Sequence, residues 1–501
     1  MMQPPTSTQA RPAWARNNRI SLALMAIGVL TVLLIPASLS NTLWFGFASA
    51  VGATAFAAFF STHLTGRFSL TSQFIYLMGL FLGGRFFLAF LFPSYPIEEC
   101  FLFSRTILTE PQIFEMTITY VVSTFGVIMG IALSKPSRDV APITSPRPLP
   151  IVRQATLMFL IPIILLMAYN SYFLLAKVIS GGYVSFFLNP ENYLDSGVAP
   201  GLVSRLALIL ISLYFFSAPE KVETKFLVMI LIVGVLGSAT GQRAPLFTSI
   251  LLIIWARVNY NQKSINLGTL IAIGLCLVVV GQSFITLRSG YSYSIFEMPR
   301  EFIHLNGISL CTLSYVIAYP DLTGPGAPNY LFAPISDYFM RLFGGIRDLF
   351  YSERSLDLLD ASGYLSYHLT YTVNPNSFFA GYGTGTSFLA EFYAMTGPIL
   401  IFVPSVVLGL FLVYLDRNLL RSRFLLLMLP MVLYQIVYSP RDAIFKAIEN
   451  FVPLTIVYVL TLGLYQLLSG RRRKPGPIFS DDAIVPSAPA GEPERCSDPS
   501  K

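Results

Sequence analysis

Long apolar runs recur along most of the chain, and polar segments separate them. An α-helix needs about twenty mainly apolar residues to cross the hydrocarbon core of a bilayer, and most of the runs approach that length. The pattern therefore predicts an all-α, polytopic integral membrane protein with about twelve transmembrane helices. The predicted spans are residues 20–39, 44–64, 74–92, 113–134, 155–176, 202–218, 226–240, 244–258, 267–287, 398–415, 424–438 and 451–469.

The spans predict five segments. They are a cytoplasmic N-terminal tail (1–19), a transmembrane block of about nine helices (20–287), a long extracytoplasmic segment (288–397), a block of about three helices (398–469) and a disordered cytoplasmic tail (470–501). The long segment exceeds a plain connector and is rich in aromatic residues. We expect short interfacial helices at 299–318 and 335–351, and Asp337 and Arg341 have the i,i+4 spacing of an ion pair.

Charge gives the orientation, because Lys and Arg favour cytoplasmic loops. Only 12% of the residues are charged, and the short loops that are richest in Lys and Arg lie inside when both termini are cytoplasmic. The four cysteines form no CxxC pair, so neither a zinc site nor a disulfide framework is indicated. Cys100 and Cys311 lie outside in this topology, where most such cysteines are simply small apolar residues. The chain has no motif for binding nucleic acid.

An arginine interrupts the apolar pattern at GSATGQRAPLFTS, residues 237–249. The flanking runs, 226–240 and 244–258, are shorter than a full span, so the turn between them is predicted to lie below the membrane surface. A guanidinium at that depth usually lines a wet cavity. Gln242 and Arg243, with the helix start at Pro245, predict a site for an oxyanion or phosphate. The alternative is an interfacial arginine that reaches toward lipid headgroups.

Arg441 repeats this arrangement after the short run 424–438, and the topology puts it on the same side as Arg243. Arg288 directly follows another predicted span and makes a third candidate. The forked guanidinium suits phosphate oxygens in two-point contact. An equally good interpretation is that the adjacent Asp442 neutralises Arg441. Four more arginines are either secondary substrate contacts or parts of a solvated face: Arg205, Arg341, Arg347 and Arg354.

Glu391, Asp442 and His368 are the candidate general bases. Glu391 lies in the glycine-rich stretch 381–397, which lacks the Gly-Lys-Ser/Thr ending of a phosphate-binding P-loop. Structural pairing of Glu391 with an arginine, and an ordinary interfacial role for His368, are the alternatives. No Asp-x-Asp pair or His pair has metal-ligand spacing, so we expect no metal and no cofactor.

Five stretches together resemble the family of integral-membrane O-antigen and related repeat-unit polysaccharide polymerases, and are particularly similar to the branch of the enterobacterial common antigen polymerase. They are GGYVSFFLNPENYLDSGVAPG (181–201), GSATGQRAPLF (237–247), FITLRSGY (284–291), NSFFAGYGTGTSFLAEFYAMTGPI (376–399) and SPRDAIFKAIENFVP (439–453). The resemblance implies transfer of a growing glycan from undecaprenyl pyrophosphate to an incoming lipid-linked repeat unit. It places this reaction at the outer face of the bacterial cytoplasmic membrane, without nucleotide or metal.

By the same resemblance, Arg243, Arg441 and Arg288 match basic positions of the family, and Glu391 is common in relatives. A chain-length regulator and a repeat-unit flippase are the partners that it implies. The nearest alternative is a ligase that moves finished glycan to another acceptor, such as lipid A or protein. A second alternative is a polysaccharide transporter or flippase, which would use charged residues inside its spans. Arg85, behind Gly83 and Gly84, is the basic residue that fits this second alternative.

Overall fold

A computed structural model describes residues 43–101, 105–134, 146–181, 200–238, 244–289, 294, 296–324, 326–344 and 354–469. The first predicted span, 20–39, and the tail from residue 470 lie outside these ranges. The helices and strands are α3 (Leu43–Thr65), α4 (Leu70–Phe81), α5 (Gly84–Leu91), β1 (Glu99–Phe101), β2 (Arg105–Ile107), α6 (Glu110–Leu133), α7 (Pro150–Gly181), α10 (Pro200–Phe216), α11 (Thr224–Gly237), α12 (Ala244–Trp255), η2 (Ala256–Tyr260), α13 (Leu267–Ser289), α14 (Met298–Gly307), α15 (Leu310–Ala318), η3 (Pro320–Leu322), α16 (Ala333–Phe343), α18 (Leu356–Ala361), α19 (Leu365–Val373), α20 (Pro375–Phe379), α21 (Phe388–Leu400), α22 (Phe402–Asn418), α23 (Arg423–Met431), η4 (Val432–Val437), η5 (Ser439–Arg441), η6 (Ile444–Ala447) and α24 (Ile448–Ser469).

The described residues are therefore mostly helical, with one pair of short strands among them, and the chain forms two compact units, Met1–Leu454 and Thr455–Lys501. Five described helices are long and apolar enough to cross a membrane, or up to seven if each bent pair counts as one span. This is the architecture of a multi-pass, all-α membrane protein. The same ranges also hold shorter apolar helices, among them α10, α11 and α12.

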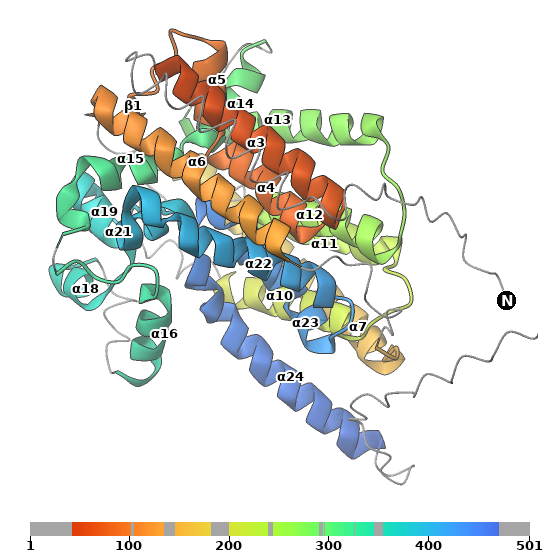
Figure 1. The fold of residues 1–501 in the computed structure, drawn as a ribbon. Helices are drawn as coiled ribbons and strands as arrows, with labels where there is room; N and C mark the ends of the chain where they lie inside the picture. The colour runs from red at the N-terminus through yellow and green to blue at the C-terminus, as the bar shows by residue number, and fades with distance from the viewer. Residues whose placement is uncertain are drawn as a thin grey trace, which may run out of the picture. The chain divides into compact units, whose positions relative to one another are not determined.

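The core of the first unit lies where α6 packs between α3 and α22 (Figure 1). Small residues allow α6 and α22 to approach closely: a Cβ on Gly130 would lie 2.8 Å from the backbone nitrogen of Leu410, and one on Gly126 would lie 2.5 Å from Cβ of Ser405. Ser405 also shares a 2.8 Å hydrogen bond with Ser123. Small residues spaced four apart are the usual means of close packing between membrane helices.

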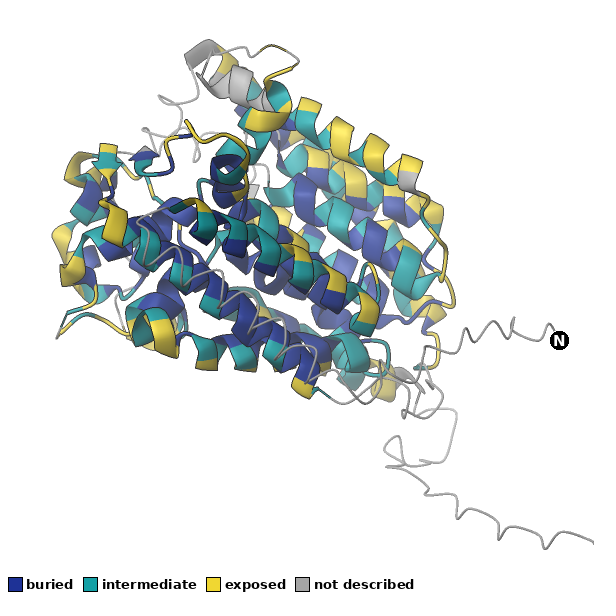
Figure 2. Ribbon diagram, turned by 45° about the horizontal axis from the view of Figure 1, so that its top comes forward, coloured by how far each residue is buried: buried dark blue, intermediate teal, exposed yellow. Residues whose placement is uncertain are grey.

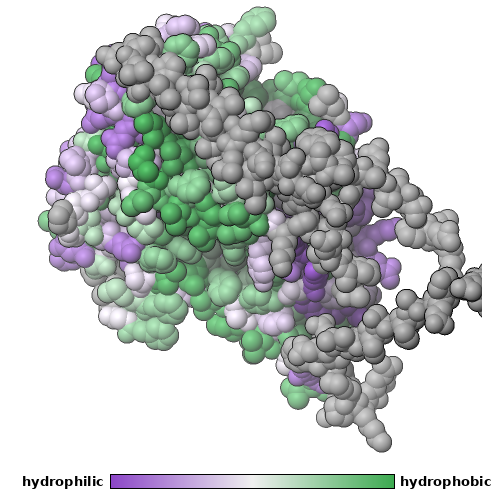
Figure 3. All heavy atoms as spheres, in the orientation of Figure 1, coloured by the Kyte–Doolittle hydropathy of each residue, from purple (hydrophilic) through white to green (hydrophobic). Residues whose placement is uncertain are grey.

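Burial and surface hydropathy follow this packing. Buried residues gather where neighbouring helices face one another, and exposed residues lie on the outer faces (Figure 2). In the orientation of Figure 1, hydrophobic atoms dominate the surface over α6 and α22, and hydrophilic atoms are more frequent toward α18 and α19 (Figure 3). An apolar surface of this kind suits contact with lipid tails.

The predicted span 74–92 is wrong as one continuous helix, because α4 and α5 meet at an angle of 53°. Gly83 lies at the break, where a Cβ would come within 2.7 Å of the Tyr120 hydroxyl. The start of α4 is capped from far along the chain: Asp416 of α22 accepts hydrogen bonds from the backbone nitrogens of Leu70 (2.7 Å) and Thr71 (3.0 Å). A carboxylate at a helix N-terminus satisfies donors that have no partner within the helix.

The two short runs around the predicted turn form a tight helical hairpin of α11 and α12. A Cβ on Gly234 would lie 2.5 Å from the Ser249 hydroxyl, so only glycine permits this approach. Ser238 caps α12 by accepting a 3.1 Å hydrogen bond from the backbone nitrogen of Leu246. The shortness of both helices agrees with the sequence prediction. The residues of the turn itself, 239–243, lie outside the described ranges.

The long segment between α13 and α22 contains several short helices, as predicted, but their boundaries differ. The predicted helix 299–318 is bent by 47° between α14 and α15. The predicted helix 335–351 is α16, which ends at Phe343, with Gly344 following. Before α6, residues that were not assigned to any element form the antiparallel β1–β2 hairpin, with Cys100 opposite Thr106.

Candidate functional site

The turn between α23 and α24 carries Arg441, and it contacts α4, α14 and α21. The π-helical turn η4 ends at Val437, and Ser439 begins the single 3₁₀ turn η5 that carries the arginine. The guanidinium lies over the ring of Phe81 at the end of α4, 5.3 Å from its centroid. Its Nη1 donates a 3.4 Å hydrogen bond to Oδ1 of Asn306 in α14. Among the described residues, no carboxylate forms an ion pair with Arg441.

Asp442 has a different partner from the one that the sequence suggested. Its carboxylate pairs with Nζ of Lys446, one helical turn later, at 2.9 Å, and accepts a 2.9 Å hydrogen bond from the backbone nitrogen of Ala443. The interpretation in which Asp442 neutralises Arg441 is therefore wrong. A half-buried guanidinium held by an aromatic ring and an amide keeps its charge available to an anion.

Glu391 reaches the same turn from α21. Its side chain is 1% exposed, and Oε2 accepts a 3.3 Å hydrogen bond from the backbone nitrogen of Ile444. Burial is the main reason that the pKa of Glu391 lies well above its ordinary value, and the neighbouring Asp442 carboxylate raises it further. The alternative that Glu391 pairs with an arginine is not what the described residues show. A carboxyl with a raised pKa is suited to exchange a proton near neutral pH.

The start of α21, which positions Glu391, is fixed by two hydrogen bonds. Ser387 is the N-cap of α21 and accepts from the backbone nitrogen of Ala390 at 3.2 Å. Its hydroxyl also shares a 3.0 Å hydrogen bond with Thr312 of α15. Ser387, Ala390 and Thr312 are all buried, so these bonds fix the start of α21, which carries Glu391, within the core.

α16 and the start of α19 contact the same region of the chain through Glu449 at the start of α24. Its Oε1 accepts from Nη2 of Arg341 at 2.7 Å and from the Tyr364 hydroxyl at 3.1 Å. Arg341 therefore forms its ion pair with Glu449, and the predicted i,i+4 pair with Asp337 is wrong. The Asp337 carboxylate instead accepts from the Ser362 hydroxyl at 2.6 Å. These contacts attach α16 and α19 to the turn that holds Arg441.

The structure does not bring the remaining described candidates to this turn. Nε2 of His368 donates to the carbonyl of Ser362 at 2.7 Å. Arg354 lies over the Tyr367 ring, 4.7 Å from its centroid, and burial lowers its pKa. Arg205 is exposed on α10 and forms none of the described ion pairs. Gln242, Arg243 and Arg347 lie outside the described residues, as does the side chain of Arg288 in α13.

Arg85 is buried at the start of α5 with 1% exposure, and its role is to hold the local fold. Nε donates to the Tyr95 hydroxyl at 3.1 Å, and that hydroxyl shares a 2.6 Å hydrogen bond with Nδ1 of His304. Nη2 donates to the backbone carbonyls of Pro96, Ile97 and Glu99. A guanidinium committed in this way anchors the chain between α5 and β1, so it gives no support to a transport pathway.

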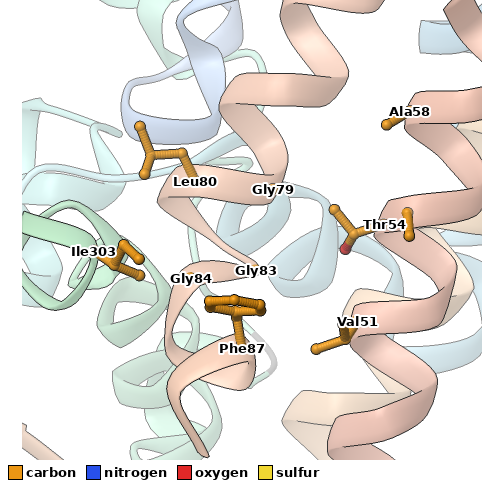
Figure 4. Close-up of a pocket in the computed structure, with 10 residues that line it drawn as sticks. Val51, Thr54, Ala58, Gly79, Leu80, Gly83, Gly84, Phe87 and Ile303 are labelled. Carbon is orange, nitrogen blue, oxygen red and sulfur yellow. The ribbon is translucent and has the colours of Figure 1, made fainter. Parts of the chain in front are cut away.

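Next to the α4–α5 break is an apolar cavity of about 330 Å³, lined by α3, by the glycines of the break and by Ile303 of α14 (Figure 4). Gly79, Gly83 and Gly84 contribute no side chains, and Phe87 and Val51 face the space. The polar side chain in the lining, Thr54, is hydrogen-bonded to Tyr120 at 2.6 Å. Such a lining suits a hydrocarbon chain rather than a sugar.

Asn306 is the site residue that sequence reasoning missed. It contacts Arg441, which lies far away in the sequence, and an isolated asparagine in an amphipathic helix gives no signal of that contact.

Among known proteins, the family model described as O-antigen polysaccharide polymerase Wzy matches residues 20–472. Neither the curated proteins nor the solved structures contain a match to the chain.

Proposed function

Since the chain belongs to the O-antigen polysaccharide polymerase Wzy family, which joins lipid-linked repeat units in the membrane, we propose the following reaction for it. A growing glycan moves from undecaprenyl pyrophosphate to an incoming repeat unit on its own lipid carrier, at the outer face of the bacterial cytoplasmic membrane. No nucleotide or metal takes part. The observation that carries this proposal is a single turn, residues 438–447, in which Arg441 has no described carboxylate partner and Ile444 donates to the buried Glu391.

Arg441 supports the leaving group. The acceptor hydroxyl attacks the anomeric carbon, the bond from that carbon to the phosphate oxygen breaks, and negative charge grows on the pyrophosphate. A fixed guanidinium stabilises that charge more in the transition state than in the ground state. Asn306 and Phe81 hold Arg441 in place, so little reorganisation is needed. Arg243, Gln242 and Arg288 are proposed as further contacts to the same pyrophosphate.

Glu391 is our choice for the general base that takes the proton of the acceptor hydroxyl. Its carboxylate receives one hydrogen bond from the backbone of the turn, whereas Asp442 is already paired with Lys446. His368 belongs to a separate cluster around Ser362 and is a weaker choice. Four more arginines are at most secondary contacts to the sugars: Arg205, Arg341, Arg347 and Arg354. Two of them, Arg341 and Arg354, already have partners within the protein.

The direct test is turnover by the purified full chain with a synthetic undecaprenyl-pyrophosphate repeat unit in the presence of EDTA. We expect polymer, and we expect Arg441→Ala to make none while Arg441→Lys keeps partial activity. Arg67→Ala, at an exposed position between α3 and α4, is the matched control and should polymerise like the wild type. Wild-type activity in Arg441→Ala, with normal insertion, contradicts the proposed site.

A gel of glycans from a deletion strain tests the reaction class separately. Loss of the ladder with a single repeat unit retained indicates a polymerase, and polymer that accumulates on its lipid carrier indicates a ligase. Co-purification of the full chain with a chain-length regulator or a repeat-unit flippase from native membranes tests the two proposed partners. Accessibility of tagged termini tests the proposal that both are cytoplasmic.

A further inference from the structure

Two cysteines far apart in the sequence meet at one atom. Nη1 of Arg85 donates to Sγ of Cys100 at 3.1 Å and to Sγ of Cys311 at 2.9 Å. Cys100 is the middle residue of β1, and Cys311 lies in the first turn of α15. Both side chains are 0% exposed. Two sulfurs that share one hydrogen-bond donor are close neighbours in space.

The backbones that carry these sulfurs are also packed together. β1 and α15 are in contact, and the Tyr315 hydroxyl of α15 donates to the carbonyl of Cys100 at 3.4 Å. On the other side, β2 holds Cys100 in register with Thr106. A disulfide forms only where two cysteines are held within a few ångströms on facing segments.

The chemistry around the pair favours a thiolate. Among the described residues, Arg85 has no carboxylate partner, and the ionisable groups that contact its buried charge are these two sulfurs and the Tyr95 hydroxyl. The hydrogen bond from the Cys311 thiol, together with the positive charge of Arg85, lowers the pKa of Cys100 to about 6. Because this environment stabilises the thiolate of the folded chain, a disulfide at this pair is easier to reduce than an ordinary structural disulfide.

We propose that Cys100 and Cys311 are joined by a disulfide bond in the mature protein. The proposal rests on the proposed function in one respect, the placement of β1 and the start of α15 at the outer face. That side of a bacterial membrane is oxidising, and disulfides persist there. The bond ties β1 to α15, and α15 directly follows α14, which carries the Asn306 that holds Arg441.

The oxidant is a thiol–disulfide oxidoreductase of that compartment in its disulfide form. The Cys100 thiolate attacks one sulfur of the oxidant, and the other sulfur leaves as a thiolate and takes up the proton that Cys100 lost. The Cys311 thiolate then attacks Sγ of Cys100, and the second oxidant sulfur leaves with the proton of Cys311. The two electrons from the protein sulfurs reduce the oxidant to its dithiol. The reaction precedes closure of β1 onto α15, because both sulfurs are buried afterwards.

The test is differential alkylation of the full chain in native membranes. Cells are quenched in acid, denatured with light N-ethylmaleimide, then reduced and labelled with the heavy reagent, and cysteine peptides are read by mass spectrometry. We expect the heavy label on Cys100 and Cys311 and the light label on Cys276, an exposed cysteine in α13. Light label on both Cys100 and Cys311 in most molecules overturns the proposal.

Single variants test the pairing. In Cys100→Ser, Cys311 should change from heavy to light label, and in Cys311→Ser, Cys100 should do the same. Cys276→Ser is the matched control and should leave the heavy label on both. A remaining cysteine that keeps the heavy label has another partner, and that result also overturns the proposal. Polymerisation by the purified wild type is measured in parallel: polymer without the disulfide refutes only the bond, and the disulfide without polymer refutes only the proposed function.

Discussion

The α6–α22 crossing gives the sharpest prediction about stability. Gly130→Ala adds one methyl group at a point where the partner helix leaves no room for it. That Cβ would lie 2.8 Å from the backbone nitrogen of Leu410 and 2.9 Å from Cα of Gly409, with the carbonyl oxygen of Val406 closer still. All of these are backbone atoms, so no side chain can rotate away, and the two helices must move apart by about 1 Å to restore ordinary contacts.

The expected cost follows from two opposing effects. Adding a methylene-sized group to a tight core costs about 1–3 kcal/mol, and backbone opposition puts this site at the upper end. Alanine in place of glycine inside a helix stabilises the helix by up to about 1 kcal/mol. The net loss is therefore about 2 kcal/mol. For a chain of this size that corresponds to a fall in Tm of roughly 2 °C.

The assay is thermal unfolding of the purified protein in detergent, followed by the fraction that stays monodisperse after heating. Gly274→Ala in α13 is the matched control, because a Cβ there meets nothing within 4 Å. It should keep or slightly raise the Tm, since only the helix propensity changes. The reasoning is refuted if Gly130→Ala and Gly274→Ala have the same Tm.

Three further predictions concern single buried groups. Glu391→Gln should lower kcat by about 10²-fold or more with little change in KM, and should remove the acid limb of the pH–rate profile; an unchanged limb assigns it to another group. Arg85→Lys should lower the Tm, because an ammonium cannot reach all the carbonyls and sulfurs that the guanidinium holds; a wild-type Tm contradicts this role. Burial raises the pKa of Asp337 above its ordinary 3.8. The protonated carboxyl therefore stabilises the fold fully below pH 3.8, and this stabilisation is lost as the pH rises through the pKa of Asp337 in the folded protein. Asp337→Asn should therefore have the higher Tm at pH 8, with the difference shrinking toward pH 4, and a constant difference argues against this.

The sequence pattern predicted long helices well and breaks within them poorly. The span predicted at 113–134 is α6 (Glu110–Leu133), and the short pair before and after residue 243 is the α11–α12 hairpin. The break between α4 and α5 was missed, because hydropathy continues across it and only the fit of Gly83 against Tyr120 marks the site. The close spacing of Gly126 and Gly130 was a readable signal for the α6–α22 contact.

The candidate site was partly predictable. Arg441 and Glu391 were chosen by residue type and by their places next to apolar runs, and the structure brings both to one turn. Their actual neighbours, Asn306 for Arg441 and Lys446 for Asp442, depend on the tertiary fold. Asp337 and Arg341 do not form the local i,i+4 ion pair. Each bonds instead to a residue farther along the chain, Asp337 to Ser362 and Arg341 to Glu449.

The cap on α4 has a consequence for the order in which the protein is made. The ribosome delivers α4 and α6 long before Asp416 and the rest of α22, yet those early helices depend on the late one for a cap and for their tightest packing. The first half of the chain therefore cannot complete its packing until α22 has been made, although α3 already packs with α4, α5 and α6. Truncation before α22 should leave a protein that inserts but is rapidly degraded, whereas removal of residues 470–501 should not.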